Sequence, residues 1–195
     1  MHGLVNKAVE LFVIDSYGGD KWEAVVRSAD APVATFEPMM LYDDAITDAL
    51  IAAAATVTGH TRPDILEDLG TYLVSHPNME TIRRLLRFGG VTLVEFLHSL
   101  DDLPDRVRMA MPDLELPRIE LREWSTSEFA LICVSEVDGF GHVMIGILRA
   151  LADDYGALAL LDHQGRAGHV ETVAITLIET DFAEGRAFEL GARAS

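Results

Sequence analysis

Apolar positions in the first half of the chain recur at the spacing of a helix. Val5, Val9 and Phe12 mark one stripe, which ends near the glycine pair Gly18-Gly19, and such a pair accepts the left-handed backbone that closes a helix. Capping residues before later apolar runs, such as Thr61, indicate further helices. After the first helix, the pattern predicts helices over residues 21–28, 45–58, from 62 onward, 78–87 and 91–103, the last of them stopped by Pro104.

The pattern changes after Pro117. Short alternating or β-rich runs come in two pairs, and one helix with apolar residues at i, i+3, i+4 and i+7 separates them. The expected strands cover residues 118–124, 129–137, 157–162 and 169–178, with the helix at 139–155 and a turn at 164–166. This order predicts an α+β fold, in which a helical N-terminal part packs on a four-stranded antiparallel sheet of the form ββαββ.

The length of 195 residues suits a single domain. We expect it to span residues 1–182, with a helical subdomain at 1–60, a pocket and sheet subdomain at 61–182, and a tail at 183–195.

Charge and cysteine content narrow the possible functions. The chain carries 15 basic and 32 acidic residues and a net charge of −17, which argues against nucleic acid and against an anionic membrane surface as partners. A single cysteine, Cys133, excludes an internal disulfide framework and a multi-cysteine metal site. No signal peptide and no apolar run of spanning length is visible. We therefore expect a cytoplasmic protein.

Four segments, in order, resemble the haem–nitric oxide/oxygen binding (H-NOX) family, which includes the N-terminal domain of the soluble guanylate cyclase β subunit. They are MHGLVNKAVELFVIDSYGGDKWE, LYDDAITDALIAAA, VEFLHSLDDLPDRV and VSEVDGFGHVMIGILRALA. The resemblance implies a haem b cofactor, sensing of nitric oxide or oxygen, and control of a partner enzyme in trans. That partner would be a histidine kinase, a diguanylate cyclase or a nucleotide cyclase.

The family's haem-ligating histidine is replaced here. The family segment has the form F-L-x-x-L-D-x-L-H, and residues 96–104 read FLHSLDDLP. Pro104 therefore occupies the histidine position, and proline has no side-chain donor atom for iron. His98 is a candidate substitute, although on a helix it would lie about 120° away from the Pro104 direction. A surface or hydrogen-bonded role for His98 is the simpler interpretation.

The family's second motif, Tyr-x-Ser-x-Arg, holds the haem propionates and is also altered. Its three positions correspond to Cys133, Ser135 and Val137. Only the serine is retained, and the valine removes the cation that would neutralise a carboxylate. Asp44 matches the acid that partners the family arginine, and it has lost that partner. The simultaneous loss of ligand and clamp predicts that haem is absent, or is held without the family histidine.

Further positions match the walls of the family's haem pocket. Val143 stands where oxygen-binding relatives have a tyrosine, and Pro117 where relatives have a proline pressing on the haem. His142 is interpreted as a polar-face residue, and Cys133 as a buried, inert thiol. The expected lining comprises Leu4, Val5, Phe12, Met79, Ile82, Leu97, Leu100, Pro117, Val143 and Ile147.

The sequence lacks the motifs G-x-S-x-G and H-E-x-x-H and a glycine-rich phosphate loop before a helix, so we expect no catalytic activity of its own. His163 and His169 flank the expected turn without a third ligand, which argues against a metal site. Three functions remain open. They are a stand-alone H-NOX-like regulatory domain with degenerate haem binding, a carrier or sensor of another apolar small molecule, and haem binding through a ligand foreign to the family.

Overall fold

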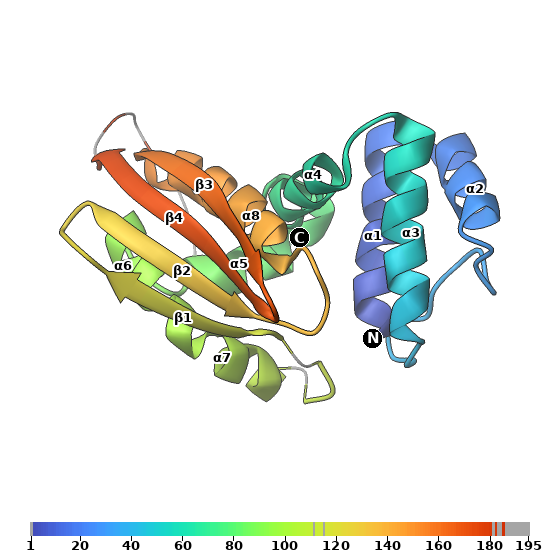
Figure 1. Ribbon diagram of the computed structural model, residues 1–195, viewed down its shortest axis with the longest axis horizontal. Helices are drawn as coiled ribbons and strands as arrows, with labels where there is room; N and C mark the ends of the chain where they lie inside the picture. Colours follow the sequence, from blue (N-terminus) through green and yellow to red (C-terminus); the bar gives the residue numbers. More distant parts are fainter. Residues whose placement is uncertain (1, 111, 115, 181, 183–184, 186–195) are drawn as a thin grey trace, which may run out of the picture.

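The helical N-terminal part forms from well-capped helices. The structure is a computed structural model that describes residues 2–110, 112–114, 116–180, 182 and 185, so most of the expected tail at 183–195 lies outside the described residues. The first four helices are α1 (Gly3–Tyr17), α2 (Gly19–Ser28), α3 (Asp44–Thr58) and α4 (Arg62–Ser75). Figure 1 shows α1, α2 and α3 side by side at one end of the molecule, with α4 between them and the sheet.

The expected helix boundaries are largely confirmed by the caps. The Asp43 carboxylate accepts a hydrogen bond from the amide of Ala45 at the start of α3. Thr61 and Asp64 form a reciprocal capping box at the start of α4. Gly18 ends α1 and also precedes α2, so α2 begins at Gly19 and Asp20 lies in its first turn rather than at its cap.

The middle of the chain differs from the expectation at Pro104. The prediction of one long helix over residues 91–103 is wrong, because this part of the chain forms three short elements instead. These are α6 (Leu93–His98), the 3₁₀ turn η2 (Leu100–Asp102) and α7 (Leu103–Ala110). Pro104 is the second residue of α7 and does not stop a helix. A proline is tolerated in a first turn because the amide hydrogen that it lacks has no helical partner there.

Before α6 lie the 3₁₀ turn η1 (Pro77–Met79) and α5 (Glu80–Arg87). His76 caps η1 through its ring Nδ1, which accepts from the amide of Asn78. The helix expected over 78–87 is therefore confirmed in its main part, with a tighter turn at its start.

The expected four-stranded antiparallel sheet is confirmed, in the order β1-β2-β4-β3. Its strands are β1 (Arg118–Glu123), β2 (Glu128–Val134), β3 (Leu158–Ala167) and β4 (Val170–Glu179). The turn expected at 164–166 is wrong: β3 continues through it with a register shift between His163 and Arg166, and the hairpin turns at Gly168-His169. A bulge of this kind redirects nearby side chains.

The helix between the strand pairs, α8 (Phe140–Tyr155), packs closely on α4. Glycines permit this approach. A Cβ placed on Gly70 would overlap the backbone of Val143, and one on Gly146 would overlap the backbone of Glu67. Helix α4 thus joins the helical end of the molecule to the helix that lies on the sheet.

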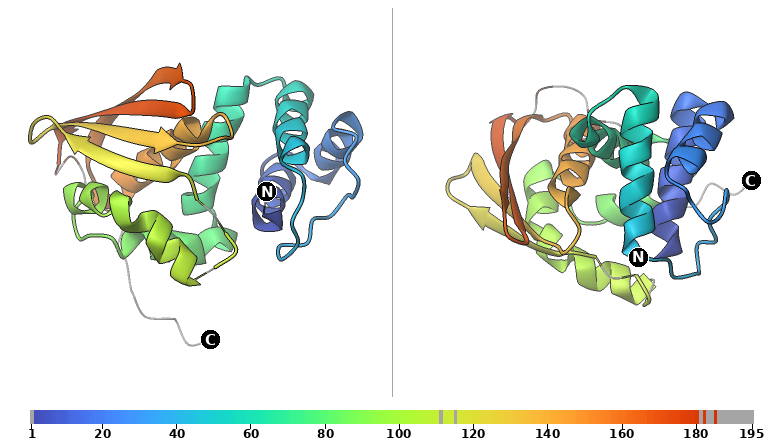
Figure 2. Two further views of the ribbon diagram at one scale, coloured as in Figure 1. Left: turned by 60° about the horizontal axis from the view of Figure 1, so that its bottom comes forward. Right: turned by 45° about the vertical axis from the view of Figure 1, so that its right-hand side comes forward.

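Two clusters of buried apolar side chains fill the interior. One lies among α1 to α4, and the other between the sheet and α5 to α8. Ile82 and Val143 pack against both clusters. The helices cover one face of the sheet, and no described helix covers the other face (Figure 2). Within the described part of the chain, no helix combines the length and apolarity needed to cross a membrane.

Candidate functional site

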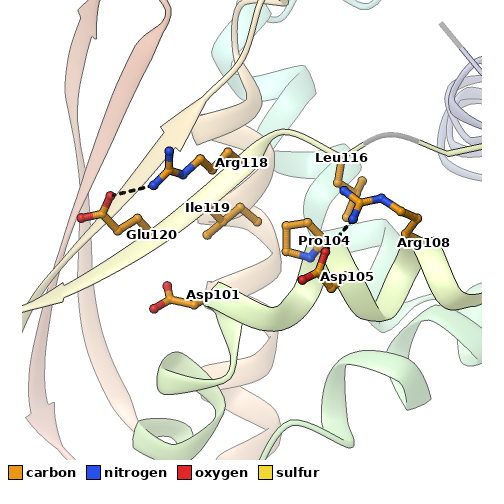
Figure 3. Close-up of a pocket in the computed structure, with 8 residues that line it drawn as sticks. All are labelled: Asp101, Pro104, Asp105, Arg108, Leu116, Arg118, Ile119 and Glu120. Carbon is orange, nitrogen blue, oxygen red and sulfur yellow. Dashed lines mark hydrogen bonds and ion pairs between the residues drawn. The ribbon is translucent and has the colours of Figure 1, made fainter.

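Pro104 lies on the wall of a surface groove between α7 and β1, which we call the Pro104 groove (Figure 3). The groove has a volume of about 470 Å³. Its lining residues are Asp101, Pro104, Asp105, Arg108, Leu116, Arg118, Ile119 and Glu120. Pro104, at the position of the family's haem-ligating histidine, therefore faces a groove with charged walls.

The charges of the Pro104 groove are paired with one another. Arg108 donates to Asp105 at 2.7 Å, and Arg118 lies 4.0 Å from Glu120. The Asp101 carboxylate accepts from the amide of Leu121 at 2.6 Å, which holds η2 against β1. Ion pairs at an exposed surface contribute little to stability. Each of these carboxylates already has a partner, so none of them is free to coordinate a metal ion.

The three positions of the propionate motif do not share one strand face. Strand β2 ends at Val134, three residues before the end of the strand expected over residues 129–137, so Ser135 and Val137 lie in the loop before α8. The Ser135 hydroxyl accepts from the amide of Val137. The backbone carbonyls of Ser135 and Glu136 accept from the Arg166 guanidinium. This loop is thus held by an arginine from β3.

Cys133 is a buried thiol inside the sheet-side cluster, 1% exposed. In the sheet it pairs with Ile119 on β1 and with Glu171 on β4. Burial raises the pKa of the Cys133 thiol to about 12, and the neighbouring Glu171 charge adds to this effect. The thiol is therefore protonated at neutral pH, whereas a metal ligand must be a thiolate.

His98 ends α6 and pairs with a residue of β1. Its Nε2 lies 3.3 Å from the Glu123 carboxylate, and the His98 side chain is 50% exposed. Its ring meets Phe129 edge-on, with centroids 6.0 Å apart. The imidazole is committed to a surface contact on the sheet.

The expected apolar lining is divided between the two clusters. Leu97, Leu100 and Ile147 belong to the sheet-side cluster, and Leu4 and Val5 of α1 pack against it. Phe12 and Met79 belong instead to the cluster among α1 to α4. Ile82 and Val143 touch both.

Pro117 precedes β1 and is half-buried. The structure does not gather the ten lining positions into one buried cluster.

The residues present do not fit a haem held in the family manner. Pro104 supplies no ligand atom, Val137 supplies no cation, and Cys133 is protonated. Across the described ranges, no cluster of three or more histidine, cysteine or acidic side chains is arranged to hold a metal ion. No chemical step through haem follows from this set of side chains.

One buried carboxylate, which the sequence alone did not indicate, lies where the loop before α8 meets the start of the helix. Glu171 on β4 is 1% exposed. It accepts hydrogen bonds from the amides of Gly139 and Gly141 at 2.8 and 2.9 Å, at the start of α8. It also contacts His163 Nε2 at 3.1 Å and Arg166 Nη1 at 3.3 Å. Glu171 thus joins β3, β4 and the first turn of α8.

The environment of Glu171 favours its ionised form. Burial raises the pKa of this carboxyl, but the hydrogen bonds from His163, Gly139 and Gly141 outweigh it and leave the pKa below the ordinary value. The positive end of the α8 helix dipole also lowers the pKa of the Glu171 carboxyl. The carboxylate is therefore a stable negative charge inside the protein.

Two stacked imidazoles extend this network to α4. The rings of His142 and His163 are 4.0 Å apart and nearly parallel, at 13°. His142 Nδ1 contacts Glu67 of α4 at 3.2 Å, and Glu67 also accepts from Arg149 at 2.8 Å. His142 is therefore a contact between elements and not a free polar-face residue. His163 takes part in the same network, whereas His169 pairs separately with Glu136.

A second arginine joins α3 to the loop before α8. Arg62 donates to Asp48 of α3 at 2.6 Å and contacts the carbonyl oxygen of Asp138 at 3.5 Å. Asp44 lies in the first turn of α3. Arg62 of α4 thus links α3 with the loop that holds Val137, the position of the family arginine.

Comparison with known proteins gives one consistent result. The family model described as Haem-NO-binding matches residues 2–159. The chain is 25% identical over 154 residues to soluble guanylate cyclase gcy-31 of Caenorhabditis elegans, covering 79% of this chain and 22% of that protein. It is 28% identical over 138 residues to guanylate cyclase soluble subunit beta-2 of Rattus norvegicus, covering 67% and 20%. The chain thus spans between a fifth and a quarter of the length of these curated relatives.

Solved structures share the fold. The Fe(II) unliganded H-NOX protein from K. algicida superimposes with a TM-score of 0.78 at 17% identity, covering 97% of this chain and all of that one. An oxygen binding H-NOX domain related to soluble guanylate cyclases gives a TM-score of 0.66 at 16% identity, covering 96% of this chain and all of that one. At these identities the likeness establishes the architecture alone.

Proposed function

The chain belongs to the haem-NO-binding (H-NOX) family, and from this premise we propose that it is a regulatory domain that controls a signalling enzyme in trans without holding haem in the family manner. H-NOX domains are sensor domains and not catalytic ones, and they signal to partner cyclases or kinases. The family is known for haem-based sensing of nitric oxide and oxygen. The proposal assigns to this chain the family's regulatory role but not the family's mode of haem binding.

The observation that carries the proposal is the joint loss of ligand and clamp. Pro104 provides no donor atom, and Val137 provides no charge for a propionate. A carboxylate buried without a partner costs several kcal/mol even after relaxation, so about this much binding free energy is lost with the clamp. The turn η2, which precedes α7, is joined to β1 through Asp101, and the loop before α8 is joined to β3 through Arg166.

Control of a partner would use the links between the two ends of the molecule. The network from Glu67 through His142 and His163 to Glu171 connects α4 with β3 and β4. Arg62 connects α3 with the loop before α8. A ligand or partner that favours one arrangement of these elements would shift the population of that arrangement.

The partner class follows from the family and from the chain's relatives, which include soluble guanylate cyclase gcy-31 and guanylate cyclase soluble subunit beta-2. We infer a histidine kinase, a diguanylate cyclase or a nucleotide cyclase. The test is to assay such an enzyme, purified from the same source, with and without equimolar chain. A change in its rate supports the partner role, and unchanged rates for all three classes contradict it.

Haem titration followed by absorbance tests the other half of the proposal. The purified chain should give no spectrum of histidine-ligated haem. Pro104→His alone should bind haem weakly. Pro104→His combined with Val137→Arg should bind haem more tightly than the sum of the two single effects, because both side chains act on the same haem. Cys133 is left unchanged, since a tyrosine there would overpack the core.

A matched control uses the end of β2. Val134→Arg adds the same cation to an exposed position that is not one of the three motif positions, and it should not improve haem binding by Pro104→His. Stoichiometric haem with an iron–imidazole bond in the unmodified chain would refute the proposal. Equal affinities for the single and double variants would refute the argument from the clamp.

A further inference from the structure

A second groove lies between α1 and α4, away from the Pro104 groove. We call it the α1–α4 groove, and its volume is about 380 Å³. Its lining residues are Phe12, Ser16, Tyr17, Asp68, Thr71, Tyr72, Ser75 and His76. It is large enough for one long side chain or a small molecule.

The floor of the α1–α4 groove is aromatic. Phe12 and Tyr72 are both buried, and their rings meet at a centroid distance of 5.7 Å. His76 stacks on Tyr72 at 4.7 Å and 26°, and Tyr17 meets Phe12 edge-on at 5.8 Å. Four rings thus support one another, and those of Tyr17 and His76 are partly exposed, so that a planar cation can stack on them.

The charge around the α1–α4 groove is negative. Asp68 is exposed on the rim, and no described side chain forms an ion pair or hydrogen bond with its carboxylate. The eight lining residues include neither lysine nor arginine. Burial raises the pKa of the Tyr17 hydroxyl, and the charges of Asp68 and Asp64 raise it further. The negative field therefore reaches into the groove.

The aromatic floor is held in position by a second acid. The Tyr72 hydroxyl donates to Asp15 at 2.6 Å, and the Asn78 amide donates to the same oxygen at 3.1 Å. His76 Nδ1 lies 3.7 Å from that carboxylate. Asp15 is therefore committed to the floor, and Asp68 is the carboxylate available to a ligand.

We propose that the α1–α4 groove binds an arginine side chain of a partner protein, with the guanidinium at Asp68 and the methylene stem against the partly exposed rings of Tyr17 and His76. The guanidinium is planar, stacks on rings and can bind a carboxylate through two hydrogen bonds, whereas the ammonium of lysine is a compact charge that holds its water more strongly. The net charge of −17 favours a basic partner segment.

The inference rests on the proposed function only in that the ligand is part of a partner protein. Binding at this groove does not depend on haem, and it can be measured without any partner enzyme. Failure of the groove and failure of the regulatory role are therefore distinguishable.

The test uses nuclear magnetic resonance titrations of the full chain with the capped tripeptide Gly-Arg-Gly and with capped Gly-Lys-Gly. The arginine peptide should shift amide signals of α1 and α4 near the groove, and the lysine peptide should bind more weakly. Asp68→Asn should weaken binding of the arginine peptide about two- to fivefold, since it removes one charge of an exposed ion pair. Glu128→Gln removes an exposed acid on β2, far along the chain from the groove, and should leave the affinity unchanged.

The proposal would be overturned by equal weakening from Asp68→Asn and Glu128→Gln, by shifts that lie outside α1 and α4, or by equal binding of the two peptides. A free alkylguanidine that binds more tightly than the arginine peptide would also overturn it, because the groove would then serve a small cation and not a partner's side chain.

Discussion

Replacement of Glu171 by glutamine should strongly destabilise the fold. The carboxylate accepts from two backbone amides, a histidine and an arginine, at 2.8 to 3.3 Å, and is almost completely buried. Glutamine has nearly the same shape, but it carries no charge and one of its two polar atoms is a donor. At least one of the four donors then faces another donor, and Arg166 loses its buried counter-ion.

The magnitude follows from the number of charge-assisted contacts. Breaking a buried ion pair by removing one partner costs about 3–5 kcal/mol. For a domain of this size, about 1 kcal/mol shifts the melting temperature by roughly 2–4 °C. We therefore expect Glu171→Gln to lower the melting temperature by about 10 °C. Glu179→Gln on the exposed end of the same strand is the control, and it should change the melting temperature by about 1 °C or less.

The pH dependence provides a second measurement. The folded-state pKa of Glu171 lies below its ordinary value of 4.5. A lowered carboxyl pKa contributes stability that is present above the unfolded pKa and is lost as the pH falls through the folded pKa. The stability difference between wild type and Glu171→Gln should therefore be constant near pH 7 and shrink below about pH 4.5. Chemical unfolding from pH 7 to pH 3 measures it, and a difference that is independent of pH would refute the assigned role.

Three further predictions concern packing, reactivity and the surface histidine. Gly146→Ala places a methyl group against the backbone of α4 and should cost about 2 kcal/mol or more, whereas Gly19→Ala meets no atom and should be neutral or stabilising in a thermal melt. Cys133 should react with iodoacetamide about a hundredfold more slowly in the native chain than in urea at pH 8, because its pKa is raised to about 12; equal rates would contradict its burial. His98→Ala removes an exposed pair with Glu123, and should change stability by about 1 kcal/mol or less and leave haem uptake unchanged.

The sequence predicted those elements whose signals are local. Apolar periodicity and caps such as Asp43, Thr61 and Gly18 identify the helices, because each cap acts on residues within one turn of itself. Alternation along β1 and the apolar run of β2 likewise identify the first strand pair. The order of these elements was sufficient to predict the fold class.

The errors fall where distant residues decide the local structure. The segment at 164–166 contains a glycine and was interpreted as a turn, but pairing of Arg166 with Glu171 of β4 keeps it in the sheet as a bulge. Pro104 was interpreted as a stop because a proline ends one helix as readily as it begins the next. Nothing within the neighbouring residues distinguishes these alternatives.

The polar network was missed for the same reason. Its members are Glu67, His142, His163 and Glu171, and the pairs that contact one another are between 8 and 75 residues apart along the chain. One weak signal exists in the sequence: Gly139 and Gly141 flank the start of a helix, and the structure shows that a Cβ on Gly141 would meet both Glu171 and His163. The glycine thus marks a close approach whose partner only the fold can identify.

The same network helps to explain how the fold accommodates residues such as Pro104 and Val137 that differ from the family motifs. The start of α8 and the loop before it are held by Glu171 and Arg166, which belong to the chain itself. The two apolar clusters include side chains from α1 through β4, and Ile82 and Val143 pack against both. A handful of polar positions can therefore change without loss of the architecture, because the architecture depends on the apolar pattern and function depends on the site.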